Sequence, residues 1–169
     1  MSLAGERAGA HYAELVLGQL QHENERKQSI EQRSIAVIST AGTLVALLFA
    51  LGAVITQAKS FEPPQQAILA LTLALACYVA SALGALRAIT VRPYQAVKTK
   101  ELTRLLEERF WEGRPVVGER RAAEARIKVL IAARQANAEK ASALKTAVWL
   151  EVTAIVATSI AMIIILLNG

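Results

Sequence analysis

The sequence predicts an all-α integral membrane protein with three transmembrane helices and a helical cytoplasmic region. Three apolar runs, Ser34–Thr56, Gln66–Ile89 and Ala147–Leu167, each reach the roughly 20 residues that a helix needs to cross a hydrocarbon core about 30 Å thick. Outside these runs the chain is rich in Glu, Ala, Arg and Lys, which favour long helices. No strand-like alternation of useful length is present, so we expect no β-sheet.

Positive charge lies almost entirely on one side of the three runs. Of the 19 Lys and Arg residues, four precede the first run, Lys59 lies between the first two, Arg87 ends the second, and 13 lie in residues 90–146. Because basic loops stay in the cytoplasm, we predict the N-terminus inside and the C-terminus outside. The predicted domains are residues 1–33 (cytoplasmic N-terminal helix), 34–56 (first span), 57–65 (external loop), 66–89 (second span), 90–146 (cytoplasmic helical region with a stalk) and 147–168 (third span).

The N-terminal segment is predicted to run as a helix directly into the first span. Residues 9–32 contain no Pro, and Tyr12 and Leu15 fall on one face at helical spacing. Nothing breaks the pattern further on, so we expect one helix over Gly9–Thr56. No apolar core followed by a small-residue cleavage site is present here, and we therefore expect no signal peptide.

Proline residues bound the second span. Pro63–Pro64 closes the external loop before it, and Pro93 follows it and disfavours helical backbone at Arg92. Beyond this break, Gln95–Trp111 has apolar residues at helical spacing and is predicted to be a helix. The Gly- and Pro-containing segment Gly113–Gly118 is predicted to be a turn.

The last part of the chain is predicted to be one long helix, a cytoplasmic stalk that continues into the third span. Residues 119–167 contain neither Gly nor Pro. Within the stalk, a 3–4 repeat enriched in Ala predicts a weak coiled-coil-like seam. Its positions are Ile127, Leu130 or Ile131, Arg134, Ala138, Ala141 and Leu144. Such narrow apolar stripes are most simply buried against further copies of the chain.

Polar residues inside the spans are the first candidates for function. Glu151 lies one turn inside the third span, where an ionisable group usually faces a bundle interior or water. We predict a pore-lining or gating carboxylate, paired with Arg87 at the same depth. The alternative is an interfacial Glu that reaches headgroup water. The hydroxyl residues predicted to line the same path are Ser39, Thr43, Thr153 and Thr158. For these the alternative is tight helix packing within one protomer.

The cytoplasmic basic charge exceeds what orientation alone requires. Residues 90–146 hold 13 basic and seven acidic residues. Such a surface attracts the phosphates of lipid headgroups, nucleotides or nucleic acid. The predicted ligand contacts are Arg120, Arg121, Lys128 and Arg134. The alternative is that these charges only set the topology and form pairs along the helix, such as Arg120 with Glu124.

Nothing in the sequence predicts an enzyme, a cofactor or a metal. P-loop, GxGxxG, nucleophile-elbow and HExxH motifs are absent from it. Cys77 is the only cysteine, which excludes a disulfide or a cysteine metal cluster within one chain. His11 and His22 lie about three helical turns apart, too far for one metal ion, and are expected to be solvated.

Three stretches resemble the transmembrane effectors of bacterial Pycsar anti-phage systems. They are ERKQSIEQR leading into ISTAGTLVALLFAL, the exit of the second span into VRPYQ (Val91–Gln95), and RQANAEKASALKTAV (Arg134–Val148) before the last span. The order of helix, two-span hairpin, cytoplasmic insert and final span is also similar. The family's Pro-Arg after the second span stands here as Arg92–Pro93–Tyr94, which is a departure. SLATT-type effectors and the channel component of Hailong systems have similar layouts.

The resemblance implies a multi-pass protein of the bacterial inner membrane that senses a nucleotide signal made during phage infection and permeabilises the membrane. A nucleotide cyclase or nucleotidyltransferase encoded nearby would supply that signal. Because three helices do not enclose a hydrated path alone, a pore requires a homo-oligomer. We therefore expect a homo-oligomeric ion channel gated by a nucleotide or oligonucleotide. The alternative is a membrane-anchored scaffold or adaptor without a pore. A transporter is disfavoured because no matched pair of broken helices is present.

Overall fold

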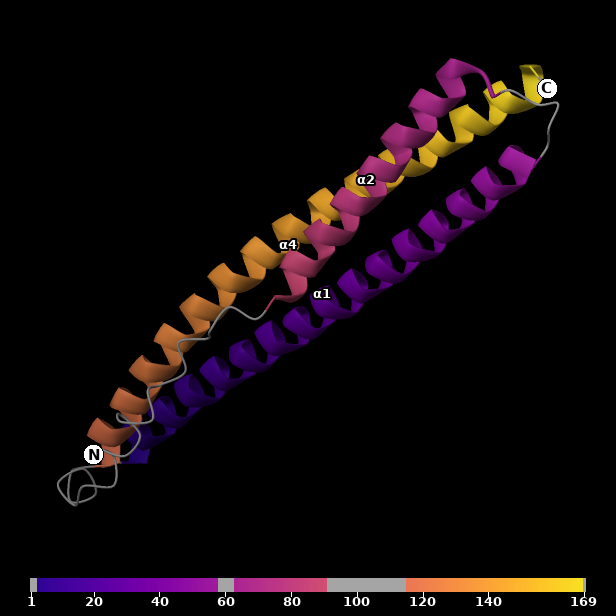
Figure 1. The fold of residues 1–169 in the computed structure, drawn as a ribbon. Coiled ribbons are helices and arrows are strands. Elements are labelled where there is room, and N and C mark those ends of the chain that lie inside the picture. Colours follow the sequence, from indigo (N-terminus) through magenta and orange to yellow (C-terminus); the bar gives the residue numbers. More distant parts are fainter. Residues whose placement is uncertain (1–2, 58–62, 91–114, 169) are drawn as a thin grey trace. The chain divides into compact units, whose positions relative to one another are not determined.

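Three long helices make up the described part of the chain. The computed structural model describes residues 3–57, 63–90 and 115–168, which form α1 (Leu3–Gln57), α2 (Gln65–Ile89) and α4 (Pro115–Asn168) (Figure 1). Each of the three is long and apolar enough to cross a membrane. The expected all-α fold with three candidate spans is confirmed, and it is that of a multi-pass membrane protein.

Helix α1 joins the polar N-terminal segment to the first apolar run without a break. It extends over 55 residues and includes Gly18, Gly42 and Gly52. None of these glycines has a positive φ, so all three adopt ordinary helical backbone. The predicted continuity of this segment with the first span is confirmed.

Pro64 and Thr90, which flank helix α2, form hydrogen bonds with backbone groups at its two ends. The carbonyl oxygen of Pro64 accepts hydrogen bonds from the N–H groups of Ala67 at 2.9 Å and Ile68 at 3.2 Å. At the other end, the backbone N–H of Thr90 donates to the carbonyl oxygen of Leu86 at 3.0 Å, and its hydroxyl donates to the same oxygen at 2.9 Å. A proline is well placed before a helix because it lacks the N–H that would stay unpaired there.

Helix α4 begins earlier than predicted. It starts at Pro115, so the predicted turn over Gly113–Gly118 is wrong for its described part, Pro115–Gly118. Proline suits the first position of a helix, where its fixed φ is helical and its missing N–H is not needed. A Gly-Pro signal here marks a helix start and not a loop. The predicted helix over Gln95–Trp111 lies outside the described residues.

The helices pack in two compact units. Unit 1 comprises Met1–Ser29 and Val91–Ala138, and unit 2 comprises Ile30–Thr90 and Glu139–Gly169. In unit 2, α1 and α4 run in the same direction and α2 runs in the opposite one (Figure 1). Helix α2 belongs wholly to unit 2, and α1 and α4 contribute to both.

A regular seam of buried positions runs along each helix of unit 2. Buried and half-buried residues recur at alternating intervals of three and four. This 3.5-residue period is the one that keeps packed helices facing each other over several turns. The seam positions are Ile30, Ser34, Val37, Ala41, Leu44, Leu48 and Leu51 in α1, Ala67, Leu71, Ala74, Tyr78, Ser81, Ala85 and Ala88 in α2, and Lys140, Leu144, Ala147, Glu151, Ala154, Thr158, Ala161 and Ile165 in α4.

Small residues bring α2 and α4 together closely in this seam. Ala85, Ala88 and Ala147 are fully buried in one apolar cluster. A Cβ atom added to Gly84 would lie only 3.3 Å from the Cβ of Ala147. Alanine and glycine permit such close approach, which drives helix association in lipid through packing contacts.

Unit 1 pairs the same helices along a seam that differs from the predicted one. In α4 the inward positions are Leu130, Ala133 and Asn137, whereas Ile127 and Arg134 are exposed. The prediction was right for Leu130 and wrong for Ile127, Arg134 and Ala138, so most of the predicted repeat lay on a neighbouring face of the helix. The reason is that Ala133 and Asn137, which carry little apolar signal, occupy the buried positions beyond Leu130.

Candidate functional site

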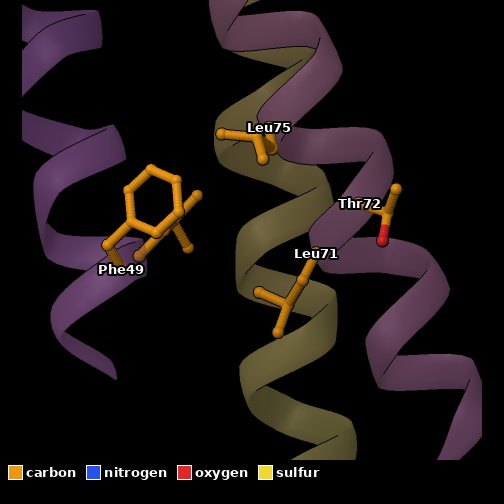
Figure 2. A pocket seen from close by; sticks show the side chains of 5 residues that line it. Phe49, Leu71, Thr72 and Leu75 are labelled. Carbon is orange, nitrogen blue, oxygen red and sulfur yellow. The ribbon is translucent and has the colours of Figure 1, made fainter. Parts of the chain in front are cut away.

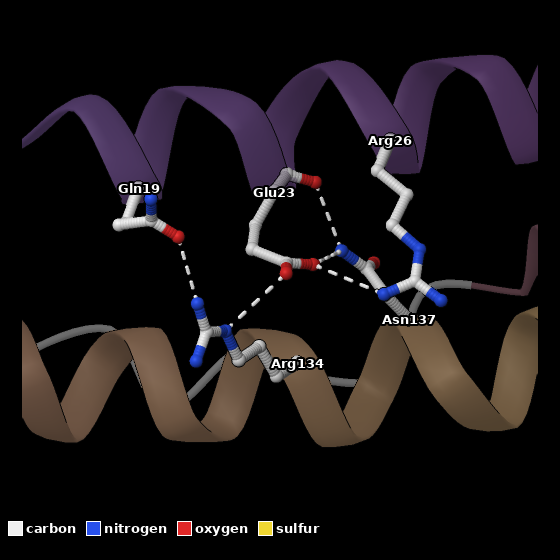
Figure 3. A network of polar contacts seen from close by, with 5 residues as sticks. All are labelled: Gln19, Glu23, Arg26, Arg134 and Asn137. Atoms are coloured by element: carbon white, nitrogen blue, oxygen red, sulfur yellow. Dashed lines mark hydrogen bonds and ion pairs between the residues drawn. The ribbon is translucent and has the colours of Figure 1, made fainter.

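A polar network joins α1 to α4 in the core of unit 1 (Figure 3). The side-chain amide of Asn137 donates to the carbonyl oxygen of Glu23 at 2.8 Å and to its carboxylate Oε2 at 2.9 Å. Asn137 and Glu23 are only 1% and 5% exposed. Arg134 completes the network: its Nη2 donates to Gln19 Oε1 at 2.8 Å, and its Nε lies 3.4 Å from Glu23 Oε1. Arg26 lies 3.7 Å from the other carboxylate oxygen.

The network gives the Glu23 carboxylate two arginines and one amide as partners. A buried carboxylate is costly unless it is paired and hydrogen-bonded, and these three groups meet that requirement. Asn137 Oδ1, which is also buried, has no hydrogen-bond partner. The Glu23 carboxylate is therefore well compensated, whereas the neighbouring Asn137 Oδ1 is an acceptor without a donor.

Arg134, a predicted ligand contact, is thus part of an intramolecular ion pair. Its side chain keeps about half of its surface accessible, so its guanidinium meets both the Glu23 carboxylate and solvent. An incoming anion would compete with Glu23 for this arginine. Such competition is a switch-like arrangement that sequence spacing did not reveal, because Glu23 and Arg134 are far apart in the chain.

The other three predicted ligand contacts lie on the exposed surface of α4. Arg120, Arg121 and Lys128 are all exposed. The Nε of Arg120 pairs with Glu124 at 3.2 Å, as predicted for a pair four residues apart. Both side chains of this pair are well exposed, and such pairs are weak, so a phosphate could displace Glu124.

Glu151 occupies a seam position of α4 in unit 2. It is 9% exposed, and its carboxylate Oε1 is buried without a hydrogen-bond partner. The fully buried Ala147 and Ala154 flank it one turn away on each side. Glu151 therefore lies inside the helix packing of its own protomer and not on an outer surface.

The predicted pairing of Glu151 with Arg87 is not formed. Arg87 is exposed, and within the described ranges of α2 and α4 no ion pair joins the two side chains. The partly buried ion pair of unit 2 is instead that of Lys140 with Glu31, at 2.7 Å. Glu151 thus lacks the compensating charge that the sequence suggested.

The predicted hydroxyl lining does not gather around Glu151. Thr158 is half-buried on the seam, whereas Thr153 is exposed and donates to the carbonyl oxygen of Trp149 at 2.9 Å. Ser39 and Thr43 are exposed on α1: Ser39 is two positions from the seam residues on either side, and Thr43 is two positions after Ala41 and directly before Leu44. At 100° per residue, these spacings put them on the side of α1 away from its seam.

Ser39 and Thr43 belong to an exposed stripe of small residues in the first span, which we call the outer stripe. Its members recur at intervals of three and four, and all are exposed. They are Ala36, Ser39, Thr43, Ala46, Ala50 and Ala53. Large residues such as Leu73, Leu83, Ile155 and Ile163 are exposed on the other two spans, and α1 exposes Ile35, Leu47 and Phe49 beside the stripe. The outer stripe is thus the face of the span best shaped for close contact with another helix.

A small apolar cavity of about 160 Å³ lies between α1 and α2 (Figure 2). It is lined by Leu48, Phe49, Leu71, Thr72 and Leu75. The Thr72 hydroxyl donates to the carbonyl oxygen of Ile68 at 2.8 Å, so the cavity offers no free donor from it. This lining suits hydrocarbon and provides no group for recognising a charged ligand.

The sequence patterns did not predict the two central residues of the unit 1 network, Asn137 and Glu23. Asn137 and Glu23 appeared as ordinary members of polar helices, although each stands on a seam of otherwise small or apolar residues. A strict heptad alignment of α1 and α4 would have placed both inside.

Comparison of the chain with known proteins found no matching family, no similar curated protein and no similar solved structure.

Proposed function

We propose that the chain assembles into a homo-oligomeric ion channel or pore of the bacterial inner membrane, controlled by an anionic nucleotide or oligonucleotide at its basic cytoplasmic helices. The observation that carries the proposal is the outer stripe. A membrane protein that met only lipid on this face would gain nothing from a row of small residues there. Copies packed through this face would bring Ser39 and Thr43 near a shared axis.

The pore path proposed for this assembly is lined by Ser39 and Thr43. Among the described residues, Ser39, Thr40 and Thr43 are the exposed hydroxyl residues of the apolar run of α1, and Ser39 and Thr43 are the two on the outer stripe. The hydroxyl of Thr43 donates to the carbonyl oxygen of Ser39 at 2.9 Å, and its oxygen still has acceptor capacity for a hydrated cation. Thr153, exposed on α4, is a second candidate, whereas Glu151 acts from inside the protomer.

The ligand site proposed for the channel lies on α4, at Arg120, Arg121, Lys128 and Arg134. A phosphate that bound Arg134 in place of Glu23 would leave the Glu23 carboxylate with one fewer cationic partner. Because α4 is one helix over Pro115–Asn168, a shift of its cytoplasmic part is transmitted along the helix. The resemblance to Pycsar-type effectors motivates a nucleotide as the source of that phosphate.

The decisive experiment is ion flux from liposomes that contain the purified protein. It is run with protein alone, with cyclic mononucleotides and with short DNA oligomers. We expect flux that changes with one ligand class and that is lost in the double variant Ser39→Leu/Thr43→Leu. The matched control is Ser159→Leu, because Ser159 is an exposed span hydroxyl outside the outer stripe. Absence of flux from inserted, oligomeric protein in every condition would favour the scaffold.

A further inference from the structure

Glu151 is a buried ionisable residue that has no hydrogen-bond donor for its carboxylate Oε1. It lies one turn of α4 from Ala147, which belongs to one apolar cluster, and one turn from Ala154, which belongs to a second. A bare carboxylate inside an apolar span is among the costliest arrangements in a membrane protein.

Three hydroxyl groups on the seams of unit 2 donate their hydrogens to backbone carbonyl oxygens and not to Glu151. Ser81 donates its hydrogen to the carbonyl oxygen of Ala147 at 2.8 Å. Ser34 donates to the carbonyl oxygen of Ile30 at 2.8 Å, and Thr158 donates to that of Ala154 at 2.9 Å. A hydroxyl has one hydrogen, so none of these three groups has a further hydrogen to donate to Glu151.

The neighbouring helices also supply no compensating charge in the parts that the structure describes. The apolar run of α1 contains no titratable or charged residue from Ser34 onward. Helix α2 contributes Cys77 and Tyr78, both ordinarily neutral at physiological pH, and the exposed Arg87. On α4 itself, Lys145 is exposed and Lys140 is paired with Glu31.

We propose that Glu151 is a binding site for a monovalent cation, either a proton or an alkali metal ion, held on the carboxylate inside the helix packing of one protomer. The unpaired carboxylate oxygen suits this occupant, since a proton or Na⁺ needs lone pairs and not donors. A divalent ion would require further carboxylate or imidazole ligands, and the described residues include no group of three such side chains. The site rests on burial and packing alone and does not depend on a pore.

An apolar carbodiimide tests the proposal on the full-length protein in liposomes. Dicyclohexylcarbodiimide adds to a protonated carboxyl group in apolar surroundings: the acid proton moves to a nitrogen, the carboxylate oxygen bonds to the central carbon, and the adduct rearranges to an N-acylurea without loss of atoms. Trypsin cleaves after Lys145, so the peptide Thr146–Gly169 contains Glu151 as its sole acidic side chain. Mass spectrometry of this peptide therefore reports on one residue. Glu139, which is exposed, serves as the internal control on the separate tryptic peptide Gln135–Lys140.

Two series distinguish the possible occupants. In choline buffer we expect labelling of Glu151 that falls as the pH is raised, with Glu139 unlabelled throughout. At fixed pH, slower labelling in NaCl or KCl than in choline chloride identifies an alkali cation that competes with the proton. Glu151→Gln removes the label from the peptide altogether. Either pattern supports the proposal, and the protein need not conduct ions for it to be seen.

Infrared spectroscopy tests the same proposal without the carbodiimide, which need not reach the buried carboxyl group. The difference spectrum between the wild-type protein and Glu151→Gln isolates the carboxyl group of Glu151. A protonated C=O stretch, or a carboxylate band that shifts between choline and sodium buffer, is the expected result. A carboxylate band that is the same in both buffers and at every pH, together with no labelling, overturns the proposal.

Discussion

Asn137 on α4 holds Glu23 on α1 through two hydrogen bonds, one to the backbone carbonyl oxygen at 2.8 Å and one to the carboxylate at 2.9 Å. The pair stands on a seam whose neighbouring α4 positions are Ala133 and Leu130. A polar pair among apolar seam positions fixes the register of two helices, because a slip by one turn would bury both groups unpaired. In unit 1 this pair is therefore a register lock between α1 and α4.

Replacing Asn137 by leucine tests the lock. The variant Asn137→Leu leaves the buried Glu23 carboxylate without its amide donor, and we expect the free energy of unfolding to fall by about 1–3 kcal/mol. The measurement is thermal unfolding in detergent, followed by circular dichroism. Gln135→Leu, on the exposed side of the same helix, is the matched control. The double variant Glu23→Leu/Asn137→Leu should recover much of the loss, since no buried group is then unpaired. Additive losses would show that the two residues are not coupled.

Charge reversal distinguishes the exposed Arg120 and Arg121 from Arg134, which is paired with Glu23. We expect Arg120→Glu/Arg121→Glu to abolish the response to an anionic ligand while leaving the melting temperature nearly unchanged, because exposed ion pairs contribute about 0–1 kcal/mol. Arg134→Glu should lower stability as well, since it places a second carboxylate against Glu23. Ligand-induced flux and thermal unfolding of the same samples are the two measurements. An intact ligand response in the double reversal would remove the proposed binding residues.

Sequence patterns predicted the helices better than their faces. Composition and the absence of Pro were sufficient for α1 and for most of α4, because backbone propensity and apolar length are local properties. The buried face of α4 was missed because Ala133 and Asn137, not Ile127, occupy its buried positions. Alanine carries little apolar signal, although in close helix packing it occupies the best-buried positions.

The candidate site was predictable only in part. Glu151 was recognised as unusual from its place in an apolar run, and its burial accords with an ionisable group that faces a bundle interior. Its lack of a partner could not be predicted, since that depends on which side chains of α1 and α2 pack beside it. The pairing of Glu23 with Asn137 joins residues 114 positions apart, and no local pattern encodes such a contact.

Removing the Ser81 hydroxyl should weaken the contact between α2 and α4. Ser81 is fully buried and donates to the carbonyl oxygen of Ala147 at 2.8 Å. Hydrogen bonds between membrane helices contribute about 0.6 kcal/mol on average, and Ser81→Ala should lower the free energy of unfolding by about that amount. Titration with a denaturing detergent measures it. Thr72→Ala is the control, because the Thr72 hydroxyl donates within its own helix. Equal losses in the two variants would mean that the interhelical bond contributes nothing beyond the hydroxyl itself.

Close approach at Gly84 makes this position intolerant of bulk. A Cβ there already meets the Ala147 Cβ at 3.3 Å, and the carbonyl oxygen of Ala143 lies 3.8 Å away. Gly84→Leu should therefore force α2 and α4 apart and lower the free energy of unfolding by about 1–3 kcal/mol. Gly84→Ala asks for a shift of only a few tenths of an ångström and should have a smaller effect. The same detergent titration measures both, and a leucine variant as stable as the wild type would contradict the close contact.

Gly42 provides the complementary test, since it is exposed beside the outer stripe of α1. A Cβ at Gly42 meets nothing within 4 Å, so Gly42→Leu should leave the folding of the protomer unchanged. If copies assemble through the outer stripe, the same leucine clashes between them, and the oligomer should dissociate in detergent. Size-exclusion chromatography with light scattering measures the mass, and Gly52→Leu, on another part of the same helix, shows how local the effect is. An unchanged oligomer with Gly42→Leu would place the interface between copies on another face, and the proposed pore lining at Ser39 and Thr43 would fail with it.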